Sequence, residues 1–271
     1  MKPGTLTIVG TGLRPRDHIT PESLAAVRDS EQVLCLMTDD ALSFLQTQAT
    51  SAPVDCTQFY RPGQHLAETY AAIVDCVLGF VRNGKDTCFA LYGHPGVFVY
   101  PSHQALRQAR AEGYEARMLP GISAEDCLFA DLGIDPAGGG CQSFWSTDLL
   151  LNAHAIDPTA SLIVWSIGVI GGLAFTGHCD PGALDLFVKK LLPVYGPHHE
   201  VVTYEAGTRD HQPCIGCCPL ERLTAEPING STTLYVPPAL SPSAYLPLYE
   251  RFGFPANAVT ELFTPRPPLA P

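Results

Sequence analysis

The sequence predicts an α/β protein in two halves, each a mostly parallel sheet flanked by helices. Short apolar runs alternate along the chain with longer segments whose apolar residues recur at helical spacing, a pattern typical of parallel strands joined by helices. The turn at Pro120-Gly121 falls inside that alternation. We therefore predict an N-terminal domain over residues 1–119, a C-terminal domain over 120–240, and a Pro-rich tail over 241–271.

The first half is predicted to begin with a strand over residues 6–9. Thr20 is a favourable N-cap and Pro21 suits the first helical position, so a helix is expected to start there. The segment 65–82 has apolar residues at helical spacing and ends at Asn83-Gly84, which predicts a long amphipathic helix. The other elements predicted in this half are strands over 32–37, 87–92 and 116–119 and a helix over 102–112.

The second half repeats the alternation of helices and strands. Ser123 is a good N-cap, and Asp126 three residues later completes an imperfect capping box at the start of a helix. The predicted elements are helices over 123–132 and 181–195 and strands over 161–166, 200–204 and 232–236.

Composition excludes several classes of function. The net charge is −11, from 16 basic and 27 acidic side chains, and such a surface repels phosphate backbones, so we expect no nucleic-acid partner. No apolar run is long enough to span a membrane. The N-terminus leads straight into a strand-like run, which predicts no signal peptide and a cytoplasmic location.

The ten cysteines are expected to be free thiols in a reducing compartment. Cys214, Cys217 and Cys218, with His211 nearby, could form half of a zinc site. A second close Cys/His pair is missing, so the spacing favours a Pro-rich loop that carries thiols and predicts no metal.

Two glycine-containing turns follow predicted strands. Gly10-Thr11-Gly12 begins like a dinucleotide-binding fingerprint, but the sixth position is Pro15 where that motif needs glycine, so it predicts a tight turn only. The turn Tyr92-Gly93-His94-Pro95-Gly96 has two glycines where a ligand can approach the backbone. With the corner before Ser123, it predicts a ligand pocket at the ends of strands.

The same stretch resembles a known family. The runs L-Y-G-H-P-G-V-F-V-Y-P-S-H-Q-A-L and E-G-Y-E-A-R-M-L-P-G-I-S-A-E-D-C-L-F-A-D-L are similar to the S-adenosylmethionine-dependent tetrapyrrole methylases. Within that superfamily they most resemble the borosin enzymes, which N-methylate the peptide backbone of a precursor. The resemblance runs from Leu6 to about Pro238. It implies a two-domain methylase fold with a cofactor cleft between the halves, and an obligate homodimer.

The resemblance also implies a set of residues that bind S-adenosylmethionine. They follow strands or begin helices, as the pocket prediction requires, and the amides near Ser123 could hold the carboxylate of the cofactor. The residues implied are Tyr92, His94, Val97, Ser123, Ala124, Ser166, Gly168, Tyr204, Ala206, Thr232 and Thr233.

The catalytic residues implied by the resemblance are tyrosines. An amide nitrogen is a poor nucleophile because its lone pair is delocalised, so its proton must be removed. The resemblance implies Tyr70 as the base and Tyr60 and Tyr92 as residues that orient the amide. The arginine that supports the base in the family falls on Leu66 here, and Arg61 is the predicted replacement. His65 is a weaker candidate for the same role.

The tail does not resemble an apolar core peptide, so a separate precursor peptide is the predicted substrate. Two alternatives stay open. One is a methyltransferase that acts on a carbon of a tetrapyrrole or corrin. The other is a non-catalytic homologue that binds the peptide, or a metal through the cysteines.

Overall fold

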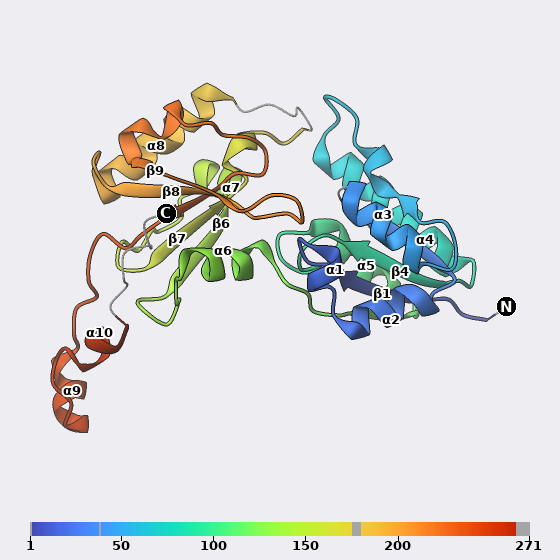
Figure 1. Ribbon diagram of the computed structural model, residues 1–271, viewed down its shortest axis with the longest axis horizontal. Helices are drawn as coiled ribbons and strands as arrows, with labels where there is room; N and C mark the ends of the chain where they lie inside the picture. Colours follow the sequence, from blue (N-terminus) through green and yellow to red (C-terminus); the bar gives the residue numbers. More distant parts are fainter. Residues whose placement is uncertain (1, 38, 175–179, 264–271) are drawn as a thin grey trace. The chain divides into compact units, whose positions relative to one another are not determined.

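The computed structural model describes residues 2–37, 39–174 and 180–263 (Figure 1). The chain divides into two compact units. The N-terminal unit comprises the described residues up to Cys127 with the short segments at Leu173-Ala174 and Gly207–His211, and the C-terminal unit comprises the rest. The predicted boundary after residue 119 remains a prediction. No described helix has both the length and the apolar character that a membrane crossing requires.

The N-terminal unit is built on a five-stranded sheet in the order β3-β2-β4-β1-β5, with every pairing parallel. Its central strands are apolar on both sides, as expected for a sheet covered on both faces. The strands are β1 (Thr5–Gly10), β2 (Gln32–Leu36), β3 (Val54–Asp55), β4 (Asp86–Leu91) and β5 (Glu115–Met118).

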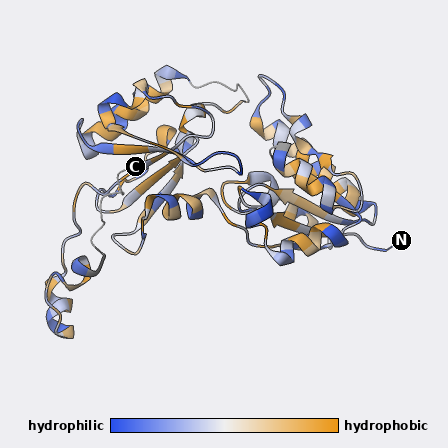
Figure 2. Ribbon diagram, viewed as in Figure 1, coloured by the Kyte–Doolittle hydropathy of each residue, from blue (hydrophilic) through white to orange (hydrophobic). Residues whose placement is uncertain are grey.

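Two helical layers cover this sheet. Helices α4 (Leu66–Arg82) and α5 (Tyr100–Ala111) pack on one face against residues such as Ile8 and Phe89. Helices α2 (Pro21–Asp29) and α3 (Asp39–Gln48) pack on the other face against Val9. Most helices in Figure 2 are orange on one side and blue on the other, which is the amphipathic pattern that such layers need. Two short helices complete the unit, α1 (Pro15–His18) and the 3-10 helix η1 (Cys56–Phe59).

The C-terminal unit contains a second five-stranded sheet, in the order β6-β7-β10-β8-β9. Only β6 and β7 are paired in parallel, whereas the other three pairings are antiparallel. The expectation of a mostly parallel sheet is therefore correct for the N-terminal unit and needs correction here. The reason is that β10 runs opposite to both of its neighbours, β7 and β8, and that β8 and β9 form a hairpin, which joins antiparallel strands without a helical crossover. The strands are β6 (Cys141–Trp145), β7 (Ser161–Trp165), β8 (Glu200–Glu205), β9 (Cys214–Pro219) and β10 (Thr233–Val236).

Helix α8 (Pro181–Tyr195) packs on one face of this sheet through Phe187 and Leu191, and α6 (Ala124–Leu132) lies along the other (Figure 1). The remaining helices are α7 (Ser146–Leu151), η2 (Ile167–Val169), η3 (Leu220–Ala225), α9 (Leu246–Phe252) and α10 (Ala258–Phe263).

Most predicted elements are confirmed to within about two residues at each end. The Thr20 hydroxyl accepts a hydrogen bond from the Ser23 amide at 3.1 Å, so the predicted N-cap is confirmed. The nine cysteines in the described residues are free. The prediction of a loop at Cys214–Cys218 is wrong, since these residues form strand β9. Residues 264–271 of the predicted tail lie outside the described residues. Sequence analysis missed α3, β3, β6, α7 and β9.

Candidate functional site

Three glycine-containing loops meet beyond the carboxyl ends of β1, β4 and β5 in the N-terminal unit. Gly12 and Gly93 exchange backbone hydrogen bonds of 3.2 and 3.0 Å. A methyl group on Gly10 would lie 2.3 Å from the Gly93 carbonyl oxygen, and one on Gly121 would lie 3.1 Å from the Gly10 Cα. Real side chains essentially never approach to 2.3 Å and seldom to 3.1 Å, so Gly10 and Gly121 serve the packing of one loop on another. This explains the incomplete fingerprint at Gly10 without a dinucleotide.

His94 is part of the framework of its turn. Its Nδ1 accepts a hydrogen bond from the Gly96 amide at 2.9 Å. The turn is held further by the Ser102 hydroxyl, which donates to the Pro95 carbonyl, and by His103 Nε2, which lies 2.9 Å from the Gly96 carbonyl. With Nδ1 acting as acceptor, the neutral His94 ring carries its proton on Nε2, which is the nitrogen left to donate to a ligand.

The corner before α6 has a complete capping box. The Ser123 hydroxyl accepts from the Asp126 amide at 3.1 Å, and the Ser123 amide donates to the Asp126 carboxylate at 2.7 Å. Capping at Ser123 is thus confirmed. Anion binding at Ser123 and Ala124 stays a prediction.

The three predicted catalytic tyrosines gather in the N-terminal unit. Tyr60 ends η1, Tyr70 lies in the second turn of α4, and Tyr92 directly follows β4. The Tyr60 and Tyr70 side chains are hydrogen-bonded to each other, and Tyr92 lies near enough to influence both electrostatically. Tyr60 and Tyr70 are partly buried against the core, whereas Tyr92 leaves 54% of its surface exposed. Residues from three separate segments therefore form one phenol cluster.

Burial controls the acidity of this cluster. Desolvation raises the pKa of Tyr60, Tyr70 and Tyr92, because the buried phenolate would lose its hydration. About half of the Tyr92 surface is exposed, so solvent screens part of this effect at Tyr92. The hydrogen bond between Tyr60 and Tyr70 adds to the raised pKa of Tyr60 and partly offsets the effect of desolvation on the pKa of Tyr70. Near neutral pH the cluster is protonated.

The segment before α4 does not bring a cation to Tyr70. Leu66 is the first residue of the helix, and its amide donates to the Leu173 carbonyl at 2.9 Å. His65 is the N-cap, with its Nδ1 accepting from the Ala67 amide at 3.1 Å. The Arg61 side chain is exposed and makes no ion pair within the described residues. Support from Arg61 therefore stays a prediction, and the His65 ring already acts as the helix cap.

A second group of predicted residues gathers in the C-terminal unit, beyond β7. Ser166 has a left-handed backbone, with φ of 58°, and its carbonyl accepts from the Ser146 hydroxyl at 2.9 Å. The next amide, that of Ile167, donates to the Thr232 carbonyl at 3.0 Å. A methyl group on Gly168 would lie 1.9 Å from the Asn229 carbonyl oxygen. The loop after β7 is thus packed directly on the turn before β10.

Glu205, the last residue of β8, fixes that turn. One of its carboxylate oxygens accepts from the Asn229 side-chain amide at 2.6 Å and from the Thr232 hydroxyl at 2.8 Å. The predicted residues Ser166, Gly168, Ala206, Thr232 and Thr233 are therefore brought to one end of the C-terminal sheet. Sequence analysis missed Asn229, although the dipeptide Asn229-Gly230 is itself a turn signal.

The Tyr204 side chain is fixed inside the C-terminal unit. It is 1% exposed, and its hydroxyl donates to the Asp131 carboxylate at 2.7 Å. The side chain is therefore committed to packing β8 on α6, and only its backbone is left for a ligand. Sequence analysis missed Asp131 because a contact across 73 positions leaves no local signal.

The residues of both groups suit S-adenosylmethionine. The cofactor has a sulfonium cation and an ammonium group, and the predicted residues offer hydroxyls, backbone groups and tyrosine rings, with no Lys or Arg among them. Gly93, with φ of 69°, has no atom within 3.8 Å of the point where a side chain would begin. A ligand can therefore approach the backbone there, as predicted.

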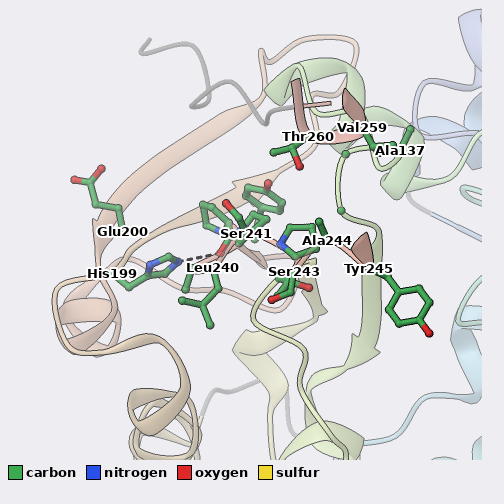
Figure 3. Close-up of a pocket in the computed structure, with 18 of the residues that line it drawn as sticks. Ala137, His199, Glu200, Leu240, Ser241, Ser243, Ala244, Tyr245, Val259 and Thr260 are labelled. Atoms are coloured by element: carbon green, nitrogen blue, oxygen red, sulfur yellow. Dashed lines mark hydrogen bonds between the residues drawn. The ribbon is translucent and has the colours of Figure 1, made fainter. Parts of the chain in front are cut away.

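A cavity of about 700 Å³ lies elsewhere in the C-terminal unit, at the opposite end of its sheet (Figure 3). One wall comes from β8, β9 and β10, and the other from residues 237–245 and helices α9 and α10. His199 Nε2 lies 3.0 Å from the Pro237 carbonyl and ties the walls together. None of the predicted site residues lines this cavity.

The cysteines of β9 are divided between the two faces of the strand. Cys217 is exposed and Cys218 is buried, because successive side chains of a strand point to opposite faces. In the part of the chain that the structure describes, no group of three or more His, Cys, Asp or Glu side chains is placed to hold a metal ion.

Comparison with known families identifies most of the chain. Residues 5–223 match the family model of the Tetrapyrrole (Corrin/Porphyrin) Methylases. Among solved structures, uroporphyrin-III-C-methyltransferase from Thermus thermophilus is similar with a TM-score of 0.63 and 17% identity, covering 92% of this chain and 96% of that one. A cobalt precorrin-4 methyltransferase is similar with a TM-score of 0.62 and 15% identity, covering 88% and 96%. These likenesses confirm the predicted two-domain α/β fold.

Curated relatives are more similar in sequence. The chain is 39% identical to the methyltransferase/ribosomally synthesized cyclic peptide dendrothelin A precursor of Dendrothele bispora, covering 88% of this chain and 58% of the relative. It is 36% identical to the omphalotin A precursor of Omphalotus olearius, covering 96% and 64%. It is also 36% identical to a type III borosin precursor of Anomoporia bombycina, covering 89% and 29%. The chain thus spans less than two thirds of each of these relatives.

Proposed function

Because this chain belongs to the tetrapyrrole (corrin/porphyrin) methylase family, we propose that it transfers methyl groups from S-adenosylmethionine to backbone amide nitrogens of a ribosomally made peptide. The predicted family resemblance is confirmed, and the names of the relatives support a methyltransferase. The observation that carries the choice of an amide substrate is the phenol cluster of Tyr60, Tyr70 and Tyr92. A phenolate in this cluster could remove the weakly acidic proton of the substrate amide.

The two groups of loop residues would hold the cofactor. In the N-terminal unit these are the His94 turn and the Ser123 corner, and in the C-terminal unit they are the segments around Ser166, Ala206 and Thr232. When bound, S-adenosylmethionine supplies an electrophilic methyl group on a positively charged sulfur. The loop residues orient that group through backbone amides, carbonyls and hydroxyls that are already fixed by internal hydrogen bonds, so little reorganisation is needed.

The tyrosines would prepare the amide. Because the cluster is protonated near neutral pH, Tyr70 first releases its phenolic proton to water, and the resulting phenolate takes the amide proton. Desolvation raises the pKa of Tyr70, whereas its hydrogen bond with Tyr60 lowers that pKa and favours the phenolate. Tyr92 stays protonated and can donate a hydrogen bond to the amide carbonyl, on which negative charge develops, while Tyr60, the other predicted orienting residue, is engaged with Tyr70. We assign the base to Tyr70 for this reason.

Three further features belong to the proposal. The peptide is supplied as a separate chain, the enzyme acts as a homodimer, and it works in the cytoplasm. Exposed apolar residues on α9 support association between subunits, and the nine free thiols among the described residues are compatible with a reducing compartment.

The test is methylation of peptide by the purified chain. The enzyme is incubated with S-adenosylmethionine and the precursor segments of the dendrothelin A and omphalotin A relatives, each made as a separate peptide. We expect mass increments of one methylene group, and fragmentation should place them on backbone nitrogens. Tyr70→Phe should abolish them while cofactor binding is kept. Unmodified peptides with the wild-type enzyme, or full turnover by Tyr70→Phe, would contradict the proposal.

Methylation of a tetrapyrrole carbon is the second candidate. It is favoured by the likeness to uroporphyrin-III-C-methyltransferase, which extends over 92% of this chain. A spectral change of a uroporphyrinogen-type substrate, without any peptide methylation, would establish this function instead. If the enzyme retains S-adenosylmethionine but modifies neither substrate, the non-catalytic alternative holds, since Leu66 stands where the family has its arginine.

A further inference from the structure

A fourth tyrosine lies against the proposed base. The rings of Tyr70 and Tyr100 are stacked, with centroids 5.7 Å apart and an angle of 26° between their planes. Tyr70 projects from α4, and Tyr100 is the first residue of α5, which packs beside α4. The contact therefore joins the proposed base to the helix that follows the His94 turn.

Core packing does not explain the position of Tyr100. Its side chain is 55% exposed, so the ring is not placed there mainly to escape water. The backbone two residues earlier is strained, since Phe98 has φ of 54°, a region that bulky residues rarely enter. Pro101 then fixes the first turn of the helix. Strain of this kind persists where the surrounding structure holds it, often beside a functional site.

Two tyrosines contact Tyr70 beyond the core residues against which it packs. Tyr60, at the end of η1, is hydrogen-bonded to its hydroxyl, and the ring of Tyr100 from α5 is stacked on its ring. Tyr92, after β4, is the other titratable group that acts on it. Within the described residues no Lys or Arg contributes, in keeping with Leu66 at the family's arginine position. A change in the χ1 angle of Tyr70 would carry its hydroxyl away from Tyr60.

We propose that Tyr100 is a positioning residue for methyl transfer, whose ring holds Tyr70 in hydrogen-bonding contact with Tyr60. The phenol pair then stabilises the phenolate that an arginine would otherwise stabilise. This inference rests on the proposed function, because it assigns Tyr70 as the base. Tyr100 itself contacts the base and takes no part in the proton transfer.

Kinetics of peptide methylation test the positioning role. Tyr100→Leu should lower kcat roughly tenfold or more with little change in KM, because misplacement of a catalytic group slows the chemical step. Tyr100→Phe keeps the ring and should stay within about threefold of the wild type. Tyr114→Leu is the matched control, since it removes a partly buried tyrosine from the same unit without touching Tyr70.

A double-mutant cycle separates positioning from general destabilisation. Tyr60→Phe and Tyr100→Leu should be strongly non-additive in kcat, because both act through one hydrogen bond to Tyr70. If the two substitutions damaged the structure independently, their effects on kcat would be additive. Additive effects, or equal losses in kcat for Tyr114→Leu and Tyr100→Leu, would overturn the proposal.

A measurement without turnover distinguishes failure of this inference from failure of the proposed function. In protein labelled with 13C-tyrosine, Tyr100→Leu should shift the Tyr70 ring signals through loss of the neighbouring ring current, and Tyr100→Phe should leave them close to their original positions. Unshifted Tyr70 signals would overturn the positioning role even if peptide is methylated. If the wild type methylates no peptide, the proposed function fails and the assignment to methyl transfer fails with it, whatever these signals show.

Discussion

Ser166 adopts a backbone conformation that few residues other than glycine tolerate. Its φ of 58° is retained because the neighbouring atoms fix the loop on both sides, through the Ser146 hydroxyl and the turn at Thr232. The hydrogen bond at this position is accepted by the backbone carbonyl of Ser166, so the Ser166 hydroxyl is not required for the fold.

We therefore expect Ser166→Gly to raise the free energy of unfolding by up to about 1 kcal/mol, because glycine enters this region without steric strain. Ser166→Val should lower it by about 1–3 kcal/mol, since a β-branched side chain clashes there. Urea denaturation of both variants and of Ser166→Ala measures the effect. Equal stabilities of the Ser166→Gly and Ser166→Val variants would show that the loop changes its backbone conformation to accommodate the side chain.

Buried thiols make stability depend on alkaline pH. Burial raises the pKa of Cys88 and of Cys35 to about 12 from a usual value of 9.0. A group whose folded pKa is raised contributes stability that is complete below its unfolded pKa and is lost as the pH rises toward the folded value. The free energy of unfolding should fall from about pH 9 upward, and Cys88→Ala should flatten that fall. Urea titrations between pH 7 and pH 11 would test it, and a pH-independent stability would refute it.

The packing of β1, β4 and β5 depends on their terminal loops. Gly10→Ala would bring a methyl group within 2.3 Å of the Gly93 carbonyl oxygen, so it should destabilise the protein by about 2 kcal/mol or more. Gly79→Ala is a matched control inside α4, because no atom lies within 4 Å of the added methyl group. It should stabilise the protein by about 0.5–1 kcal/mol through helix propensity. Thermal unfolding of both variants compares the two effects, and similar losses would contradict the assigned role of Gly10.

Elements with a strong apolar period were predictable from the sequence. Helix α4 presents Ile73, Val77 and Val81 on one face, so both its existence and its extent could be read directly. Strand β9 could not, because Gly216 and Pro219 lower strand propensity and the strand lies at an edge of its sheet. The two site clusters were predictable only as separate segments. Their internal bonds, such as that between Ser146 and Ser166, join distant positions and have no local signature.

At the scale of the whole molecule, α9 is unusual in burying none of its residues. Leu246, Leu248 and Phe252 are all about half exposed or more. Apolar side chains gathered on one short helix are a surface for association. This agrees with the proposed homodimer.

If α9 contributes to that dimer, the double substitution Leu248→Ser and Phe252→Ser should shift the protein toward the monomer at a given concentration, because less apolar surface is removed from water. Light scattering after size-exclusion chromatography measures the mass. Arg251→Ser on the same helix is the matched control and should leave the mass unchanged. A dimer that resists the double substitution would place the interface elsewhere.

The bridge between His65 and Ala174 has a consequence for how the protein is made. All five strands of the first sheet are synthesised by residue 118, well before Leu173, so that sheet can form early in translation. The backbone partners of His65 and Leu66 are synthesised only later, when Leu173 and Ala174 emerge. The first turn of the helix that carries Tyr70 is thus completed after its own sheet. A nascent chain released before that point could form the first sheet but would lack the backbone partners of His65 and Leu66 at the start of this helix.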